Sequence, residues 1–348
     1  MSLLEDKKIN TTPISKLGEF GLIDHLTKDI KTKNESSILG IGDDAAVIDM
    51  GDKYQLVSTD LLVEGVHFDL AYTPLKHLGY KAVAVNVSDV CAMNGEAKQI
   101  TVGLAMSNRF TVEALDELYE GINLACTNYG VDLVGGDTTS SSSGLMISIT
   151  VLGEVVKENI VYRSGAKVND LVVCTGDLGA AYLGLQLLKR EKEVFVDNPT
   201  IQPDLTGNDY VLRRQLKPES AVKYNKILKE LRIIPTSMID ISDGLSSEVL
   251  HLAKASSVGI TIHEDKIPID YTTMNLANEF NMNPVVCALS GGEDYELLFT
   301  VAQDHYDKLK KDPDFTIIGF VTDISEGNNF IANDGSSHRL TAQGWDAL

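Results

Sequence analysis

Acidic residues placed directly after short apolar runs are the side chains in this sequence best suited to chemistry. Each of these acids also stands close to Gly, Ser or Thr. They are Asp43 and Asp44 after ILGIG, Asp60 after YQLVST, Asp89 after AVAVNVS, Asp137 after VDLVGG, Asp240 and Asp243 after SMI, and Glu293 and Asp294 after ALSGG. Because α/β proteins bind ligands at the ends of neighbouring strands, we expect these strand ends to converge into one site with roughly six carboxylates or more.

Carboxylates a few ångströms apart cannot all stay ionised without compensation. Two outcomes are open: some of the acids are protonated, as in a carboxyl pair for acid–base work, or hard cations neutralise them. The neighbouring hydroxyls of Ser58, Thr59 and Ser242 are oxygen ligands of the kind that Mg²⁺ and Ca²⁺ prefer. Several Mg²⁺ ions bridging the protein to a polyphosphate suit the pattern best. For any single aspartate, a helix cap or a turn is an equally good interpretation.

The composition supports a role for metal ions. The 348 residues include 50 acidic and 30 basic side chains, for a formal net charge of −20. This balance argues against nucleic acid or an anionic membrane as the main partner, since both require basic surface. An anionic substrate such as a nucleotide would therefore bind only if metal ions supplied positive charge.

The cysteines and the first residues bear on the cellular compartment. Cys91, Cys126, Cys174 and Cys287 are widely spaced and form no CxxC pair, so we expect single buried thiols rather than a zinc site or disulfides. The opening MSLLEDKKIN lacks the apolar core of a signal peptide, and no stretch approaches the ~20 apolar residues of a membrane span. These features predict a cytoplasmic protein with no membrane partner.

Hydrophobic patterning predicts which elements must position the acids. Helices are expected over 14–31, 111–129, 180–191, 219–231 and 246–257, and strands over 45–49, 54–60, 99–106, 131–137, 145–155, 171–176, 259–264 and 315–322. Residues 74–94 fit either one long buried helix or a helix that runs into a strand. Strands and helices mix in both halves, which predicts an α/β or α+β fold. The length favours two domains, which we divide into residues 1–158 and 159–348.

Eight motifs, in order along nearly the whole chain, carry a resemblance to a known family. They are EFGLI (19–23), GIGDDAAV (40–47), STDLLVEGVHF (58–68), KAVAVNVSDVCAMNG (81–95), LVGGDTT (133–139), RSGAKVND (163–170), DISDGLSS (240–247) and LSGGEDYEL (289–297). With these, the sequence resembles the thiamine-monophosphate kinase family, within the ATP-binding superfamily that includes aminoimidazole ribonucleotide synthetase. EGVHF, SGGEDYEL and the terminal GWD (344–346) point to the kinase family in particular. Asn94 departs from the glycine expected there, which affects a local turn.

The resemblance implies a fold and a reaction. The fold has two α/β domains like aminoimidazole ribonucleotide synthetase. The N-terminal domain binds ATP and Mg²⁺ and pairs with its twin in a homodimer, and the C-terminal domain completes the ATP and substrate site. The reaction is direct, in-line transfer of the ATP γ-phosphoryl group to thiamine monophosphate with the help of several Mg²⁺ ions. Its products are thiamine diphosphate, in the last step of that compound's biosynthesis, and ADP.

The resemblance also implies roles for individual residues. The positions that match magnesium ligands are Asp44, Ser58, Thr59, Asp60, Asp89, Asp137, Asp240 and Asp243. Those that match ATP contacts are Tyr119, Gly136, Asp137, Arg163 and Ser242. Around the thiamine phosphate the matching positions are His67, Glu293 and Trp345.

The chemistry of this reaction agrees with the residues present. The nucleophile is a phosphate oxygen with a second pKa of about 6, so it needs no general base, and the motifs contain no evident one. The barrier lies in bringing two anions together, which metal ions and Arg163 would lower. The cationic thiazolium ring suits the carboxylate of Glu293 and an aromatic face at Trp345.

Two other functions stay open. Aminoimidazole ribonucleotide synthetase is the nearest enzymatic alternative because it shares the ATP half. A non-catalytic module that binds divalent ions or nucleotides is the alternative from a different class. Selenophosphate synthetase is disfavoured, because its reactive Cys or selenocysteine would lie near the start of the chain and the first cysteine here is Cys91.

Overall fold

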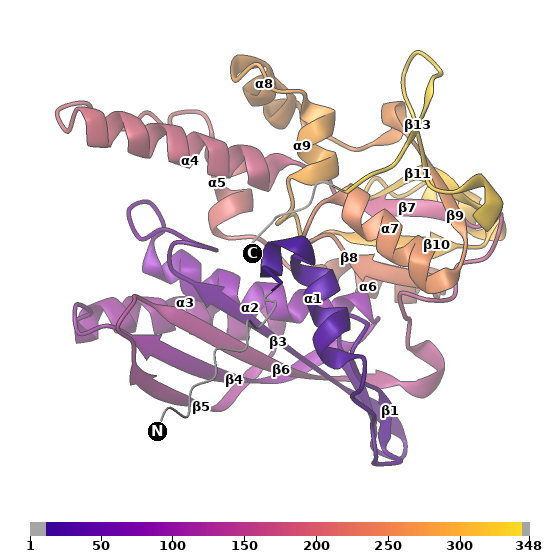
Figure 1. Cartoon of the computed structure of the whole chain (residues 1–348), viewed down its shortest axis with the longest axis horizontal. Coiled ribbons are helices and arrows are strands. Elements are labelled where there is room, and N and C mark those ends of the chain that lie inside the picture. The colour runs from indigo at the N-terminus through magenta and orange to yellow at the C-terminus, as the bar shows by residue number, and fades with distance from the viewer. Residues whose placement is uncertain (1–11, 343–348) are drawn as a thin grey trace, which may run out of the picture.

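The computed structural model describes residues 12–342, which form two β-sheets with helices between and around them (Figure 1). The first sheet has the strand order β1-β2-β3-β6-β4-β5. Its strands are β1 (Ser37–Leu39), β2 (Ala46–Asp49), β3 (Lys53–Val63), β4 (Glu96–Met106), β5 (Asp132–Ser140) and β6 (Met146–Val156). Neighbouring strands are antiparallel except for β4 and β5, which are parallel.

The second sheet follows in the chain and has the order β13-β12-β9-β11-β7-β10-β8. Its strands are β7 (Leu171–Thr175), β8 (Ser237–Asp240), β9 (Gly259–His263), β10 (Leu297–Val301), β11 (Phe315–Thr322), β12 (Asn329–Ile331) and β13 (Ser337–Arg339). Only the β9–β12 pair is parallel. The mixed fold predicted from the sequence is confirmed.

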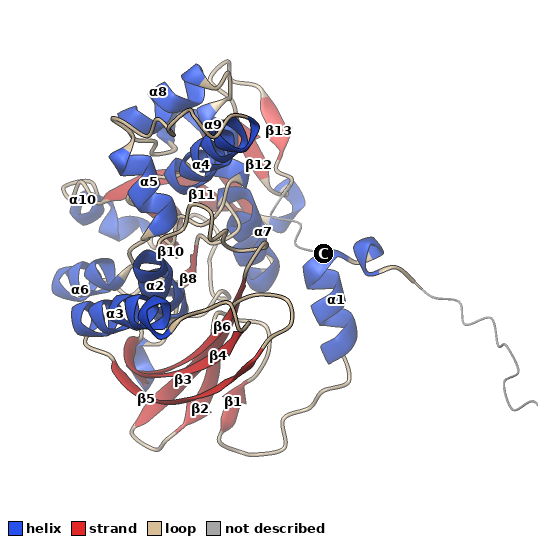
Figure 2. Cartoon of the chain, turned by 90° about the vertical axis from the view of Figure 1, so that its left-hand side faces the viewer, coloured by secondary structure: helices blue, strands red, loops and turns tan. Residues whose placement is uncertain are grey.

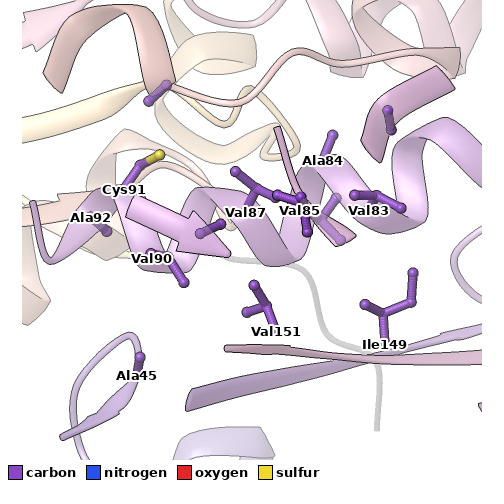
Figure 3. Packing of buried hydrophobic residues seen from close by; sticks show 14 of the residues in the cluster. Ala45, Val83, Ala84, Val85, Val87, Val90, Cys91, Ala92, Ile149 and Val151 are labelled. Carbon is purple, nitrogen blue, oxygen red and sulfur yellow. The ribbon is translucent and has the colours of Figure 1, made fainter. Parts of the chain in front are cut away.

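Two long helices, α2 (Leu75–Ala92) and α3 (Val112–Tyr129), lie on the first sheet (Figure 2). Thr111 caps α3, as expected, by accepting a hydrogen bond from the amide of Ala114. Valines of α2, such as Val83 and Val90, face Ile149 and Val151 of β6 (Figure 3). The same hydrophobic core continues into β7, β8, β10 and α6 (Val222–Leu231), so α2 lies between the two sheets.

The α2 segment settles the alternative that periodicity left open, since it is one continuous helix. Its buried residues surround the helix axis, so a pattern that depends on one polar face could not reveal it. Valines such as Val83 and Val87 have modest helix propensity, but burial on both sides outweighs that cost.

The remaining helices surround the second sheet. Helix α7 (Leu245–Ser256) packs its Leu245, Val249 and Leu252 against one face of that sheet. The others are α1 (Gly18–Thr27), α4 (Ala180–Asp197), α5 (Asp209–Leu216), α8 (Tyr271–Glu279), α9 (Pro284–Ser290) and α10 (Tyr306–Leu309). Within residues 12–342, no helix is both long and apolar enough to cross a bilayer.

Several predicted elements differ from the structure. The helix expected over 14–31 is a short 3-10 turn followed by α1, and the helix expected over 180–191 continues to Asp197. Helices α5 and α8 were not predicted. The proposed strand ends are wrong for five of the acids: Asp60 and Asp137 lie within β3 and β5, Asp89 lies in α2, and Glu293 and Asp294 follow helix α9. Strands β3 and β5 continue through their polar residues because each forms a long run of backbone pairs with a neighbouring strand.

Candidate functional site

A cleft of about 1510 Å³ is lined by residues from both sheets and from α1, α2, α4 and α7. It brings together most of the residues singled out in the sequence. These are Asp44, Ser58, Thr59, Asp60, His67, Asp89, Arg163, Asp240, Ser242, Asp243 and Glu293. The expected convergence of acidic residues is therefore confirmed for this set, although three different kinds of local structure supply it.

Three aspartates form the centre of the cleft. One carboxylate oxygen each from Asp44, Asp89 and Asp240 lies within 4.8 Å of the others. Asp44 comes from the loop between β1 and β2, Asp89 from α2, and Asp240 from the last position of β8. With Asp60, which also lines this part of the cleft, we call them the acidic cluster.

Hydroxyl groups fix two of these carboxylates. Ser58 Oγ donates to Oδ2 of Asp89 at 2.5 Å, and Ser88 Oγ donates to Oδ2 of Asp240 at 2.6 Å. The second bond joins α2 of the first half to β8 of the second half. Because Ser88 and Asp89 are adjacent on α2, that helix sets the distance between the two carboxylates.

Arg163 is the basic side chain that contacts the acidic cluster. Its Nη2 and Nε lie 2.6 and 3.2 Å from Oδ1 of Asp44. The backbone amide of Arg163 donates to Asp43, whose carboxylate also accepts from the amide of Asp44. The GDD turn and the segment that enters the second half are therefore tied together at the cleft.

Burial and mutual repulsion raise the pKa values of the cluster. Burial raises the pKa of Asp240 to about 7, with a further contribution from Asp44. Burial likewise raises the pKa of Asp60 to about 6. The pKa of Asp89 lies well above its ordinary value because of burial first, and then because of the charges of Asp60 and Asp240. Without added cations, the cluster thus retains protons near neutral pH.

The donor set fits a hard divalent cation. All members of the cluster offer carboxylate oxygens, which Mg²⁺ prefers. Oδ2 of Asp44 is buried and accepts no hydrogen bond within the described part of the chain. Such an orphan acceptor normally has a partner, and a bound cation would supply one.

Two glycine-containing loops complete the site by packing on each other. The amides of Glu293 and Tyr295 donate to the carbonyl oxygens of Ser242 and Ile241 at 2.7 and 2.8 Å. At Gly292 the backbone has φ +69°, and a Cβ there would lie 2.5 Å from the Ser242 carbonyl oxygen. The SGGED motif therefore needs glycine for this close approach.

Glu293 is held by two neighbours. Its Oε1 lies 2.7 Å from Nζ of Lys81, and its Oε2 accepts a hydrogen bond from Nε2 of Gln215 at 2.8 Å. Lys81 also donates to the carbonyl oxygen of Gln215 at 3.2 Å. The carboxylate thus has a fixed position at one end of the cleft, and its charge is matched by a buried ammonium group.

Two other predicted residues, His67 and Thr59, form hydrogen bonds with backbone groups. Ring nitrogen Nδ1 of His67 accepts from the amide of Val63 at 3.0 Å. The Thr59 hydroxyl donates to the carbonyl oxygen of Ile149, and strand alternation places it on the opposite face of β3 from Ser58 and Asp60. The hydroxyl of Thr59 is therefore turned away from the acidic cluster.

Three of the predicted ATP contacts do not line this cleft. Gly136 and Asp137 lie on the exposed strand β5, and Tyr119 lies on α3 against the hydrophobic core. Gly136 has a structural reason to be glycine, because a Cβ would lie 1.9 Å from the Val102 carbonyl oxygen. Trp345 lies outside the described residues.

Three further residues of the cleft were not predicted from the sequence: Lys81, Gln215 and Glu248. One signal could have revealed Lys81: it stands eight positions before Asp89, which is the same face of a helix. That signal was unusable while the α2 segment could also be a strand. The carboxylate of Glu248, the residue directly after the DISDGLSS motif, accepts hydrogen bonds from the backbone amides of Ser242 and Asp243.

Comparisons with known proteins identify the family. Residues 42–155 match the model described as AIR synthase related protein, N-terminal domain. The thiamine-monophosphate kinase of Bacillus subtilis (strain 168) is 36% identical over 337 residues, which cover 95% of this chain and 99% of the relative. That of Aquifex aeolicus (strain VF5) is 35% identical over 332 residues, which cover 95% and 98%.

A solved structure agrees with the sequence relatives. It is described as AaThiL complexed with AMPPCP and TMP, and it matches with a TM-score of 0.83 at 34% identity, over 97% of this chain and 100% of that one. Full-length agreement of sequence and fold, with the acidic cleft described above, leads to one conclusion. The chain belongs to the thiamine-monophosphate kinase family.

Proposed function

We propose that this chain transfers the γ-phosphoryl group of ATP to thiamine monophosphate, and that it does so directly, with Mg²⁺ held by the acidic cluster. The observation that carries the proposal is the meeting of Asp44, Asp89 and Asp240 within 4.8 Å in a large cleft. Family membership supports the two substrates, since a related structure was solved with AMPPCP and TMP.

Different residues of the cleft have different proposed roles in metal binding and phosphate binding. Asp44, Asp60, Asp89 and Asp240 would hold Mg²⁺, which when bound neutralises phosphate oxygens and orients them for in-line transfer. Arg163 stands beside the cluster and adds a fixed positive charge. The acceptor phosphate is already ionised at neutral pH, so the chain needs to bind and align it rather than deprotonate it.

We further propose that the molecule is a homodimer formed through β5. This strand is an edge of the first sheet, all nine of its residues are exposed, and Val134 is 57% exposed. An open edge with apolar side chains favours pairing with a second copy. Pairing there would cover Gly136 and Asp137.

Val134→Asp is expected to give monomers in sedimentation analysis, whereas Val112→Asp on α3 should leave the dimer intact.

The division at residues 158 and 159 and the cytoplasmic location also belong to this proposal. The six strands of the first sheet end at Val156, and the second sheet begins at Leu171. All four cysteines are free and buried, as a reducing compartment allows.

The decisive experiment is incubation of the purified protein with ATP, Mg²⁺ and thiamine monophosphate. Equimolar thiamine diphosphate and ADP, absent when Mg²⁺ or acceptor is omitted, would establish the reaction. Folded, ATP-binding protein that forms no thiamine diphosphate would reject it. The next acceptor to test would then be that of aminoimidazole ribonucleotide synthetase, followed by Mg²⁺-dependent ATP binding alone.

A further inference from the structure

Lys81 is a buried lysine within an otherwise largely apolar helix. It is 3% exposed, and within residues 12–342 no other lysine is buried. An ammonium group is costly to bury unless it is paired, and here Glu293 and the Gln215 carbonyl oxygen are its partners. A methionine or leucine would fill the same space without that cost, so a charge at this position calls for a reason.

The position of Lys81 relative to the acidic cluster suggests the reason. Lys81, Val85 and Asp89 lie one turn apart on the same face of α2, and all three line a small inner cavity of about 130 Å³. The helix rise separates the first and last by about 12 Å. The cavity thus has Asp89 of the acidic cluster at one end of this face and the Lys81–Glu293 pair at the other.

The charges along this cavity are unequal. Carboxylates at the cluster end repel a phosphate unless metal ions neutralise them. At the other end the Lys81–Glu293 pair is neutral overall, and Lys81 is the only Lys or Arg among the described residues that line the inner cavity. Glu293 beside it supplies negative charge. This pair matches a ligand that combines a phosphate with a cationic ring.

We propose that Lys81 binds the phosphate group of the acceptor, beside Glu293, and so determines the preference of the site for a phosphorylated over an unphosphorylated acceptor. The inference rests on the proposed function, because that function defines the acceptor. Beyond that function, it assigns Lys81 to acceptor binding and gives a physical source for the preference for a phosphorylated acceptor. The four-carbon side chain lets the ammonium group follow the phosphate while Gln215 keeps Glu293 in place.

A purely structural pair is the competing explanation. Glu293 and Tyr295 have positive φ values of 61° and 52°, which cost free energy and require support from their surroundings. If Lys81 only supports this loop, its loss should weaken every ligand of the loop to the same degree. The two explanations therefore differ in how binding of phosphorylated and unphosphorylated ligands changes.

The test measures binding of thiamine monophosphate and of thiamine by calorimetry, with Mg²⁺ present and ATP absent. In Lys81→Met, the preference for thiamine monophosphate over thiamine should fall about 10- to 100-fold, as for a lost charged hydrogen bond, with thiamine affinity nearly unchanged. Lys76→Met is the matched control, because Lys76 lies on the same helix in an exposed pair with Glu120. It should leave the preference unaltered.

Equal losses for both ligands, or an unchanged preference, would overturn the inference. If Lys81→Met does not fold, the double variant Lys81→Met/Glu293→Gln removes the unpaired carboxylate and should show the same loss of preference. If the wild-type protein phosphorylates thiamine monophosphate but Lys81→Met keeps the wild-type preference for thiamine monophosphate over thiamine, only this inference is rejected. Wild-type protein that neither binds nor phosphorylates thiamine monophosphate would reject the proposed function with it.

Discussion

Two groups of carboxylates within residues 12–342 differ in their access to the cleft and in how their charge is compensated. The acidic cluster lines the cleft. The second group, which we call the arginine cluster, comprises Asp177, Asp294 and Glu296 around Arg214, and none of these residues lines the cleft. Nη1 of Arg214 donates to Glu296 at 2.8 Å, and its Nη2 lies 3.6 Å from Asp294.

The charges that act on each group show the difference. At Asp294, burial raises the pKa to about 7, and the strongest charge effect is the opposing one of Arg214. At Asp89, the charges that add to burial are those of other aspartates, and they raise the pKa further. The arginine cluster thus contains its own cation, which contacts Glu296 and Asp294 directly, although Oδ1 of Asp294, Oδ1 of Asp177 and Nε of Arg214 have no hydrogen-bond partner within the described residues. The acidic cluster remains short of positive charge, which an incoming cation would supply.

The largest effect is expected from removing the cation of the arginine cluster. Arg214→Met leaves Asp294 and Glu296 buried without their partner, which should lower the free energy of unfolding by about 3–5 kcal/mol. Urea unfolding monitored by circular dichroism measures this. A loss of less than about 1 kcal/mol would mean that the arginine cluster does not depend on its cation for stability.

Removing a carboxylate from the acidic cluster should affect activity instead. Asp89→Asn should lower kcat about 10²- to 10³-fold, because a preorganised charge in the site is lost, and the metal-free protein should unfold at no lower urea concentration than wild type. Steady-state kinetics and the same unfolding assay test both parts. An unchanged kcat would remove Asp89 from the proposed metal site.

The two clusters also predict how stability depends on pH. Asp240 and Asp60 have folded-state pKa values of about 7 and about 6, above the ~3.9 of an unfolded aspartate. The folded state therefore binds more protons between pH 4 and 7, and stability should fall as pH rises through that window.

Magnesium should distinguish the clusters in this experiment. In saturating Mg²⁺, the part of the loss that comes from the acidic cluster should disappear, because the bound cation replaces the protons. The part that comes from Asp294 should remain. Thermal unfolding at a series of pH values with Mg²⁺ or with chelator provides the comparison. Identical curves would contradict metal binding at the cluster.

The smallest effect is expected for an ion pair outside both clusters. Lys53 and Glu154 form a 2.7 Å pair between neighbouring strands, and their side chains are 51% and 43% exposed. Water and salt screen such a pair. Lys53→Met should therefore leave the midpoint of urea unfolding nearly unchanged, and a shift as large as that of Arg214→Met would show that burial is not what separates the clusters.

The sequence predicted the composition of the acidic cluster better than it predicted the structure around it. Apolar runs followed by Asp44, Asp89 and Asp240 led to the right residues. The reason was only partly right, since one of the three ends a strand. Motif content depends on side-chain chemistry, which is visible in sequence, whereas the local fold of a fully buried segment such as α2 depends on what packs around it.

The arginine cluster could not be predicted from the sequence. Arg214 lies on α5, in a polar stretch where no helix was predicted before residue 219, and its acidic partners come from segments far away in sequence. Local patterns contain no information about such long-range pairs. The same limit applies to Lys81 and Glu293, which are separated by 212 positions and meet only when the second half of the chain packs on α2.

The single helix that carries both Lys81 and Asp89 has a consequence for how this protein can change over evolution. One residue inserted between them would turn Asp89 about 100° around the helix axis and move it about 1.5 Å along it, away from the other carboxylates. No loop interrupts α2 between the two residues to absorb that change. The interval from 81 to 89 should therefore keep its length among active relatives, even where surface loops such as the one between β12 and β13 gain or lose residues.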